Sequence, residues 1–263
     1  MFFSRVSRRF SRDIKLFRLL ENWRDAFKAE ATRGPLRVAR LRNGVVIRGP
    51  ETIDLAFLFH EIWVEEIYRS PGFEIRGGET VVDIGANIGV FATYAATRAP
   101  GVKVLSFEPF PDNVFWLQKN VEESGLRNVS VTQKAVAGVL GSQCLRVDPS
   151  NWILHALASN GHEGEGLRVE CTSLDEIMDA NNIRRCDLLK LDCEGSEYEI
   201  LRKCSPGTLS RIRRIVGEIH EAKHIDDSVD SLCSFLQSRS FRIDRAHPIT
   251  GGGGFISAIN TAL

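Results

Sequence analysis

Two groups of residues in this sequence have the types and spacing needed to act on a bound small molecule. The first is the segment VVDIGANIG at 81–89, where glycines follow a short apolar run. The second consists of carboxylates and a histidine placed after two later apolar runs, namely Asp192, Glu194, Glu218 and His220. A glycine loop suits a nucleotide-like ligand, and a histidine among carboxylates suits proton transfer or substrate binding.

The glycine loop predicts a ligand that contains a nucleoside but no phosphates. Its spacing is G-x-N-x-G, through Gly85, Asn87 and Gly89, whereas a pyrophosphate loop reads G-x-G-x-x-G. We expect Gly85 to let the backbone approach the ligand and Gly89 to let the following helix pack on the strand. The loop amides would then bind a carboxylate of the ligand, and Asp83 would bind its amine.

Glu108 supports the same interpretation from a second position. It stands in the run Ser106-Phe107-Glu108-Pro109, about twenty residues after the loop, at the expected carboxyl end of the next strand. A carboxylate at this place can accept both hydroxyl groups of a ribose. We therefore predict that Glu108 binds the ribose of the ligand.

The second group predicts where the chemistry takes place. His220 has an ordinary pKa suited to a general base near neutral pH, and Asp192 or Glu194 could orient it, stabilise positive charge or hold a substrate. Alternatively, the two carboxylates cap a helix that starts near Gly195. Glu218 could accept a substrate hydroxyl. Asp192, Glu194 and His220 could also bind a divalent cation, but their spacing does not require one, and we expect no metal.

Short β-rich runs that alternate with helical stretches must position these residues. Such alternation predicts βαβ units on a mostly parallel sheet. We expect its strands near Thr80–Asp83, Lys103–Phe107, Val129–Gln133, Asp187–Asp192 and Arg214–Glu218.

Further strands are expected outside this series. Two extra strands fall at Cys144–Val147 and Leu167–Cys171, and Phe241–Arg245 with Phe255–Ile259 would form a closing hairpin with the last strand antiparallel. The predicted fold is α/β, with a Rossmann-like sheet in a domain over 76–263. Residues 1–75 form an N-terminal extension of helix and hairpin.

The extension is the basic part of an otherwise balanced chain. Residues 1–48 hold thirteen Lys and Arg against four acids, although all 263 residues carry no net charge. Ile14–Ala29 has apolar residues at helical spacing and predicts an amphipathic helix. This helix could pack on the enzyme body or make peripheral contact with an anionic membrane surface. Val38–Arg48, interrupted by Asn43-Gly44, predicts a β-hairpin.

Composition excludes several classes of protein. A net charge of zero gives no overall field toward nucleic acid, and we expect no nucleic-acid partner. The six cysteines form no C-x-x-C pair, which argues against both a disulfide framework and a thiolate metal site. No run reaches the roughly 20 apolar residues of a membrane span, and the chain lacks a signal-peptide pattern. We expect a soluble, cytoplasmic protein.

The chain from about residue 79 to 221 resembles the FkbM family of methyltransferases. The resemblance rests on five motifs: VVDIGANIG at 81–89, FEP at 107–109, TSLDEI at 172–177, LKLDCEGSEYEIL at 189–201 and GEIHE at 217–221. It implies a class I methyltransferase fold and S-adenosylmethionine as the cofactor. From its place after a strand, we expect Asp192 to bind this cofactor as well. The resemblance also implies transfer to a hydroxyl oxygen of a sugar, glycolipid or natural product.

One stretch departs from the family pattern. Members often carry a polar residue that reads the adenine amine after the third strand, whereas this chain has Ala135-Val136-Ala137-Gly138. We expect Ala135 to lie at the adenine, with backbone groups or another residue making the polar contact.

Other functions remain open at this point. A methyltransferase acting on RNA or protein is favoured by the basic N-terminus, but no N-P-P-[YF] motif is present and aromatic residues are not interleaved with the basic ones. A nicotinamide-dependent oxidoreductase lacks its G-x-G-x-x-G fingerprint here. A non-catalytic binding module would not need an intact cofactor loop. The sequence does not indicate the acceptor or the oligomeric state.

Overall fold

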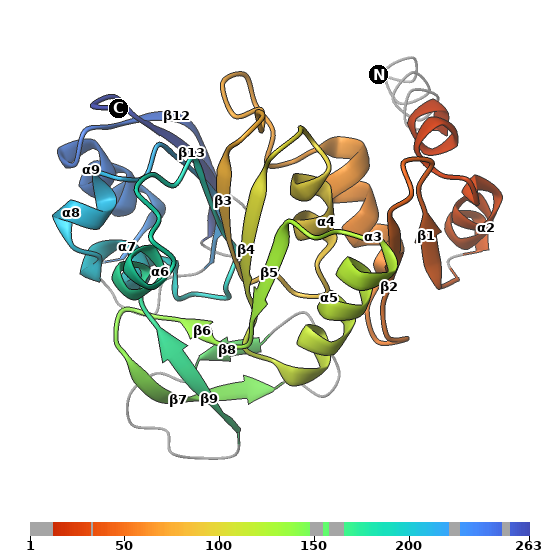
Figure 1. The fold of residues 1–263 in the computed structure, drawn as a ribbon, viewed down its shortest axis with the longest axis horizontal. Helices are drawn as coiled ribbons and strands as arrows, with labels where there is room; N and C mark the ends of the chain where they lie inside the picture. The colour runs from red at the N-terminus through yellow and green to blue at the C-terminus, as the bar shows by residue number, and fades with distance from the viewer. Residues whose placement is uncertain (1–12, 33, 148–154, 158–165, 221–226, 249–252) are drawn as a thin grey trace.

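A seven-stranded sheet organises the molecule (Figure 1). The computed structural model describes residues 13–32, 34–147, 155–157, 166–220, 227–248 and 253–263. The spatial order of the strands is β12-β13-β11-β10-β3-β4-β5. Their bounds are β3 (Thr80–Ile84), β4 (Lys103–Phe107), β5 (Val129–Thr132), β10 (Leu188–Leu191), β11 (Arg214–Ile219), β12 (Phe241–Pro248) and β13 (Gly254–Asn260).

The strand directions confirm the predicted fold class. Strands β3, β4, β5, β10 and β11 pair in parallel. Strand β13 runs antiparallel to both of its neighbours, β11 and β12, as expected of the closing hairpin. All five predicted parallel strands overlap the observed ones. The sheet therefore has the class I methyltransferase architecture that the family resemblance implied.

Helices cover both faces of this sheet because successive apolar residues in its strands point to opposite sides. Leu188 packs in the same core as α4 (Val90–Ala96) and α5 (Pro111–Glu123), and Leu189 packs with α7 (Glu197–Lys203) and α9 (Val229–Ser238). The short helices α6 (Leu174–Ala180) and α8 (Pro206–Leu209) join the second of these layers. Figure 1 shows the two layers on either side of β3.

A second, smaller sheet follows β5. Its strand order is β6-β9-β7-β8, and Figure 1 shows it beside one end of the main sheet. Its strands are β6 (Ala135–Val136), β7 (Gly141–Val147), β8 (His155–Leu157) and β9 (Leu167–Thr172). The two predicted extra strands are thus present in β7 and β9, where they pair antiparallel with each other.

The N-terminal extension differs from the prediction at its helix. The expected single helix is broken, because residues 13–19 form one helix and α2 (Trp23–Thr32) forms another. Between them the Asn22 side chain donates to Val38 O and accepts from Arg40 N, so it pairs with the backbone of a strand. The predicted hairpin is present as β1 (Val38–Arg40) and β2 (Val46–Arg48).

The extension continues as helix and packs on the main core. Helix α3 (Leu55–Phe59) runs into η1 (His60–Glu65), a turn of π-helix. Phe59 and Ile47 belong to the same buried cluster as Ile88 of the glycine loop. In the part of the chain that the structure describes, no helix has the length and apolar character to cross a bilayer. Residues 1–12 of the basic segment lie outside the described residues.

Candidate active site

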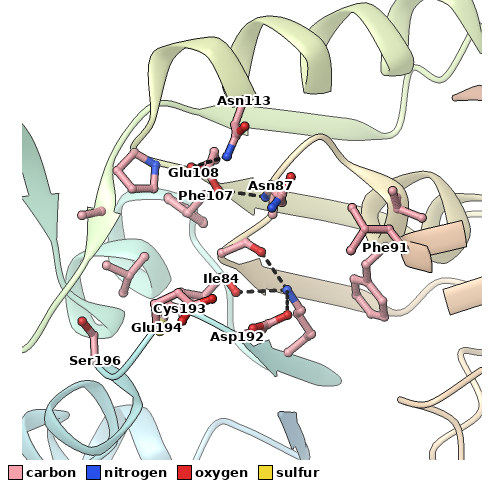
Figure 2. A pocket seen from close by; sticks show the side chains of 18 of the residues that line it. Ile84, Asn87, Phe91, Phe107, Glu108, Asn113, Asp192, Cys193, Glu194 and Ser196 are labelled. Atoms are coloured by element: carbon pink, nitrogen blue, oxygen red, sulfur yellow. Dashed lines mark hydrogen bonds and ion pairs between the residues drawn. The ribbon is translucent and has the colours of Figure 1, made fainter. Parts of the chain in front are cut away.

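A pocket lies at the carboxyl ends of β3, β4 and β10, where open α/β sheets bind their ligands (Figure 2). It is bounded on one side by the glycine loop and on another by the small sheet. Six of the predicted site residues line it: Gly85, Asn87, Glu108, Ala135, Asp192 and Glu194. The structure therefore brings most members of the two sequence groups to one cavity.

Gly85 is held where only glycine fits. Its φ of 73° lies in the left-handed region, and a Cβ on Gly85 would overlap the carbonyl oxygen of Asp192. The β3 loop and the end of β10 are therefore in backbone contact. This backbone contact brings the glycine loop and the carboxylates that follow β10 next to each other.

The loop amides do not face the pocket as the sequence suggested. The N–H groups of Gly85 and Ala86 both donate to Phe107 O, and the N–H of Gly89 donates to Ala86 O. The N–H of Asn87 donates to Glu108 Oε2 at 2.8 Å, and the N–H of Ile88 donates to the Asn87 side chain. Phe107 O, the Glu108 carboxylate and the loop's own oxygens accept from these N–H groups, so the structure does not show the loop amides directed to a ligand carboxylate as expected.

Glu108 links the loop to the helix that follows β4. Its carboxylate accepts from the N–H groups of Asn87 and Phe110 at 2.8 and 3.0 Å, and the amide of Asn113 lies 3.5 Å away. Burial raises the pKa of Glu108 to about 7, although these donors favour the ionised form. Figure 2 shows Glu108 and Asn113 together at one end of the pocket.

Asp83 lies beneath the loop and is absent from the pocket wall. It is fully buried, and its Oδ1 lies 3.2 Å from Lys190 Nζ. Lys190 also donates to Gly85 O at 2.8 Å and lines the pocket. Burial opposes the charge on Lys190, but Asp83 and Asp192 outweigh it and raise the lysine pKa. The expected contact between Asp83 and a ligand amine is corrected to an ion pair that supports the loop.

Gly89 has a packing role different from the predicted one. It is the N-cap of α4 with a φ of 85°, and a Cβ there would overlap the Leu117 side chain. Leu117 belongs to α5, so the close contact joins two helices, whereas the sequence suggested a helix against a strand. Gly89 is not on the pocket wall.

The small sheet supplies an apolar wall. Ala135 and Val136 of β6 and Leu145 of β7 line the pocket on this side and are buried. Phe107, at the end of β4, lines the same cavity. These side chains can hold a flat apolar group but offer no side-chain polar contact to it.

The acidic side of the pocket is built on the turn after β10. Tyr68 donates to Asp192 Oδ2 at 2.9 Å and fixes that carboxylate. Glu194 has a φ of 56°, a left-handed conformation uncommon for residues other than glycine. This turn directs Glu194 Oε2 to within 3.4 Å of His220 Nε2, while Asp192 Oδ1 lies 3.9 Å from the same nitrogen.

His220 is oriented by a residue that the sequence analysis missed. Its Nδ1 lies 2.9 Å from Oε1 of Glu197, a fully buried carboxylate that also accepts from Cys193 N. Burial lowers the pKa of His220, but Glu197, Glu194 and Asp192 raise it more, to about 9. The pKa of His220 therefore lies above the ordinary value on which the general-base prediction relied, which favours its protonated form near neutral pH.

Negative charge accumulates around this imidazolium. Burial raises the pKa of Glu194 to about 7, with a further contribution from Asp192. Burial also raises the pKa of Glu61, on η1, to about 7, and Glu218 and Asp192 add to the shift. Glu218 lies among these carboxylates but not on the pocket wall. The described part of the site is thus rich in carboxylates, and burial raises the pKa of two of them, Glu61 and Glu194, to about 7.

The residues that sequence reasoning missed are those that position other side chains or the loop of the site. Lys190 supports the loop, Glu197 orients His220, and Tyr68 holds Asp192. Lys190 is a charged residue within an otherwise apolar, buried parallel strand. Because charged residues are rarely buried without a partner, this position could have been recognised from the sequence. Tyr68 and Glu197 gave no such signal, because their partners lie 124 and 23 residues away.

Comparison with known proteins gives a consistent match. The family model described as Methyltransferase FkbM domain matches residues 83–243. The 31-O-demethyl-FK506 methyltransferase FkbM of Streptomyces tacrolimicus is 27% identical, over 78% of this chain and 88% of its own. The hexuronic acid methyltransferase AglP of Haloferax volcanii is 27% identical, over 70% and 82% of the two chains. A SAM dependent methyltransferase from Aquifex aeolicus superposes with a TM-score of 0.41 at 13% identity, over 75% and 89%.

Proposed function

Because the chain belongs to the FkbM family of methyltransferases, we propose that it transfers a methyl group from S-adenosylmethionine to a hydroxyl oxygen. The observation that carries the proposal is the pocket in which Glu108 and the acidic side of Asp192 and Glu194 occupy opposite ends (Figure 2). A ligand with a ribose at one end and a positive charge at the other matches this arrangement.

The pocket offers a partner to each part of the cofactor. Glu108 lines the cavity, and its carboxylate would accept the two ribose hydroxyls in addition to the protein donors that it already has. Ala135 and Leu145 flank the adenine. Asp192 attracts the positively charged methionine end of the cofactor. In a partly buried site, salt in the solvent screens the attraction between these opposite charges only weakly. When bound, S-adenosylmethionine supplies an electrophilic methyl group on a sulfonium.

The protein contributes alignment and a place for the acceptor proton. Methyl transfer is an in-line displacement, for which orientation of the reacting atoms supplies much of the rate. Glu194 lines the pocket and can accept a hydrogen bond from the acceptor hydroxyl. His220 holds Glu194 in place through a charge-assisted contact of 3.4 Å.

The names of the relatives support a hydroxylated acceptor. One relative is described as a 31-O-demethyl-FK506 methyltransferase and another as a hexuronic acid methyltransferase. We propose a sugar, glycolipid or natural-product hydroxyl as the acceptor class. A screen with radiolabelled cofactor against uronic acids, neutral sugars, macrolides and total RNA distinguishes this class from the alternative of RNA methylation.

Glu108→Gln is expected to weaken the binding of S-adenosylmethionine by about tenfold or more, because each charge-assisted hydrogen bond contributes roughly 1.5–3 kcal/mol. Calorimetric titration of the wild-type protein and the variant measures the effect. NADH, titrated separately, should not bind.

The matched control is Glu122→Gln, at an exposed position of α5. It removes the same charge and should leave the affinity unchanged. Preference of the wild-type protein for NADH, or equal affinity of Glu108→Gln and wild type for S-adenosylmethionine, would contradict the proposed cofactor site.

The affinity for S-adenosylmethionine is expected to fall as the pH decreases through about 7. Burial raises the pKa of Glu108 to about 7, and only its ionised form accepts both ribose hydroxyls. Protonation therefore competes with binding, and the dissociation constant should rise about tenfold between pH 8 and pH 6. Titrations at both pH values test this, and Glu108→Gln should abolish the part of the pH dependence that comes from this carboxyl.

A further inference from the structure

Three donor atoms converge where the turn after β10 meets the end of β11. One oxygen each of Asp192 and Glu194 and one nitrogen of His220 lie within 4.8 Å of one another. The nitrogen is Nε2, which is 3.9 Å from Asp192 Oδ1 and 3.4 Å from Glu194 Oε2. We propose that Asp192, Glu194 and His220 bind a divalent metal ion, which displaces the proton from His220 Nε2 to solvent while Nδ1 keeps its proton toward Glu197.

The separations suit an ion better than direct hydrogen bonds. Ligands at about 2.1–2.4 Å from a six-coordinate ion lie roughly 3.0–3.4 Å apart when adjacent and roughly 4.2–4.8 Å apart when opposite. The 3.4 Å from His220 Nε2 to Glu194 Oε2 matches adjacent ligands, and the 3.9 Å to Asp192 Oδ1 lies between the adjacent and the opposite separation. Small rotations of the Asp192 and Glu194 side chains, both partly exposed, complete the coordination.

The surroundings of the three residues resemble the second sphere of a metal site. A histidine ligand usually donates its other ring N–H to a carboxylate, which fixes the ring and makes the ligating nitrogen more basic. Glu197 Oε1 is in this position, 2.9 Å from His220 Nδ1. Tyr68 likewise occupies Asp192 Oδ2, which leaves Oδ1 to face the cluster.

The charge around the cluster also favours a cation. Lys190 Nζ lies 3.2 Å from Asp83 and 3.6 Å from Asp192 Oδ2, so this one lysine is shared between two carboxylates and does not neutralise both. A divalent ion would compensate the carboxylates that remain.

The donor set indicates the class of ion and its open positions. One imidazole and two carboxylates suit Mn²⁺, Mg²⁺ or Zn²⁺. Asp192 and Glu194 line the cofactor pocket, so the coordination positions left by the protein face the space for the acceptor. An oxygen of the methyl acceptor could occupy one of these positions. This consequence rests on the proposed function, but binding of the ion itself is independent of that function.

The test uses Mn²⁺ as the probe, with the full chain first treated with chelator and with no S-adenosylmethionine present. Calorimetry should give one bound Mn²⁺ per chain with a micromolar dissociation constant. Pulsed electron paramagnetic resonance of the bound ion should show nitrogen modulation from an imidazole. Titration of S-adenosylmethionine into the same samples reports separately on the proposed function.

Two variants of the proposed ligands and one control variant distinguish coordination of the ion from its nonspecific attraction to nearby negative charge. Glu194→Gln should weaken Mn²⁺ binding about a hundredfold, and His220→Asn should also remove the nitrogen modulation. Glu61→Gln removes an equal charge beside the cluster and should change the affinity by no more than about threefold. Circular dichroism melting curves identify any variant that fails to fold. Absence of Mn²⁺ binding to the wild type, bound Mn²⁺ without nitrogen modulation, or equal losses in Glu61→Gln and Glu194→Gln would overturn the proposal.

Discussion

Gly85→Ala is expected to abolish detectable methyl transfer and to lower the free energy of unfolding by about 2–5 kcal/mol. The new Cβ would overlap the carbonyl oxygen of Asp192, so the β3 loop and the end of β10 must separate. That separation displaces Asp192 from Glu108 and the rest of the pocket. A displacement of about 1 Å at a reacting site can cost about a hundredfold in rate. Chemical denaturation and calorimetric titration with S-adenosylmethionine measure the two effects.

Gly78→Ala is the matched control for this substitution. Gly78 has a φ of 75°, close to the 73° of Gly85, but a Cβ there would contact nothing within 4 Å. The control therefore carries the same backbone strain, about 1–2 kcal/mol, without the overlap. If Gly85→Ala were as stable as Gly78→Ala and bound the cofactor normally, the close contact between loop and strand would not be needed to form the pocket.

The fold could be predicted because its determinants are local in sequence. Apolar runs of four to six residues, separated by helical stretches, indicated every parallel strand of the main sheet. The antiparallel β13 followed from a hairpin pattern. The N-terminal helix was the exception, because the sequence between 14 and 29 keeps its helical periodicity through the break. The break depends on Asn22, whose side chain pairs with β1, and such a contact between distant segments has no periodic signature.

The candidate site was predicted in position but not in its internal contacts. Glu108, Asp192 and Glu194 line the pocket because strand ends meet at one edge of a parallel sheet. The raised pKa of His220 could not be inferred, since it results mainly from contact with Glu197, which lies 23 residues away in the sequence. Likewise, the loop amides were assigned to a ligand because β4 was not known to use them.

Lys190→Met is expected to lower the free energy of unfolding by about 3–5 kcal/mol, the usual loss when one member of a buried ion pair is removed. Lys190 is 3% exposed, and its Nζ lies 3.2 Å from Asp83, which is fully buried. The substitution keeps most of the side-chain volume but leaves the Asp83 charge without its nearest cation. It also removes the hydrogen bond to Gly85 O, so the affinity for S-adenosylmethionine should fall as well. Equilibrium denaturation and calorimetric titration measure the two losses.

The loss of stability in Lys190→Met should shrink as the pH is lowered from 8 to 5. Burial raises the pKa of Asp83 even beside Lys190, and loss of the lysine raises it further above its value in the unfolded chain. A raised pKa in the folded state makes ionised Asp83 destabilising at high pH, and protonation relieves this cost as the pH falls. Asp83→Asn combined with Lys190→Met should recover much of the stability, because it removes the isolated charge. Lys203→Met, which breaks the exposed pair with Glu199, should cost at most about 0.5 kcal/mol at either pH. A Lys190→Met loss no larger than that of Lys203→Met would mean that the buried pair does not support the loop.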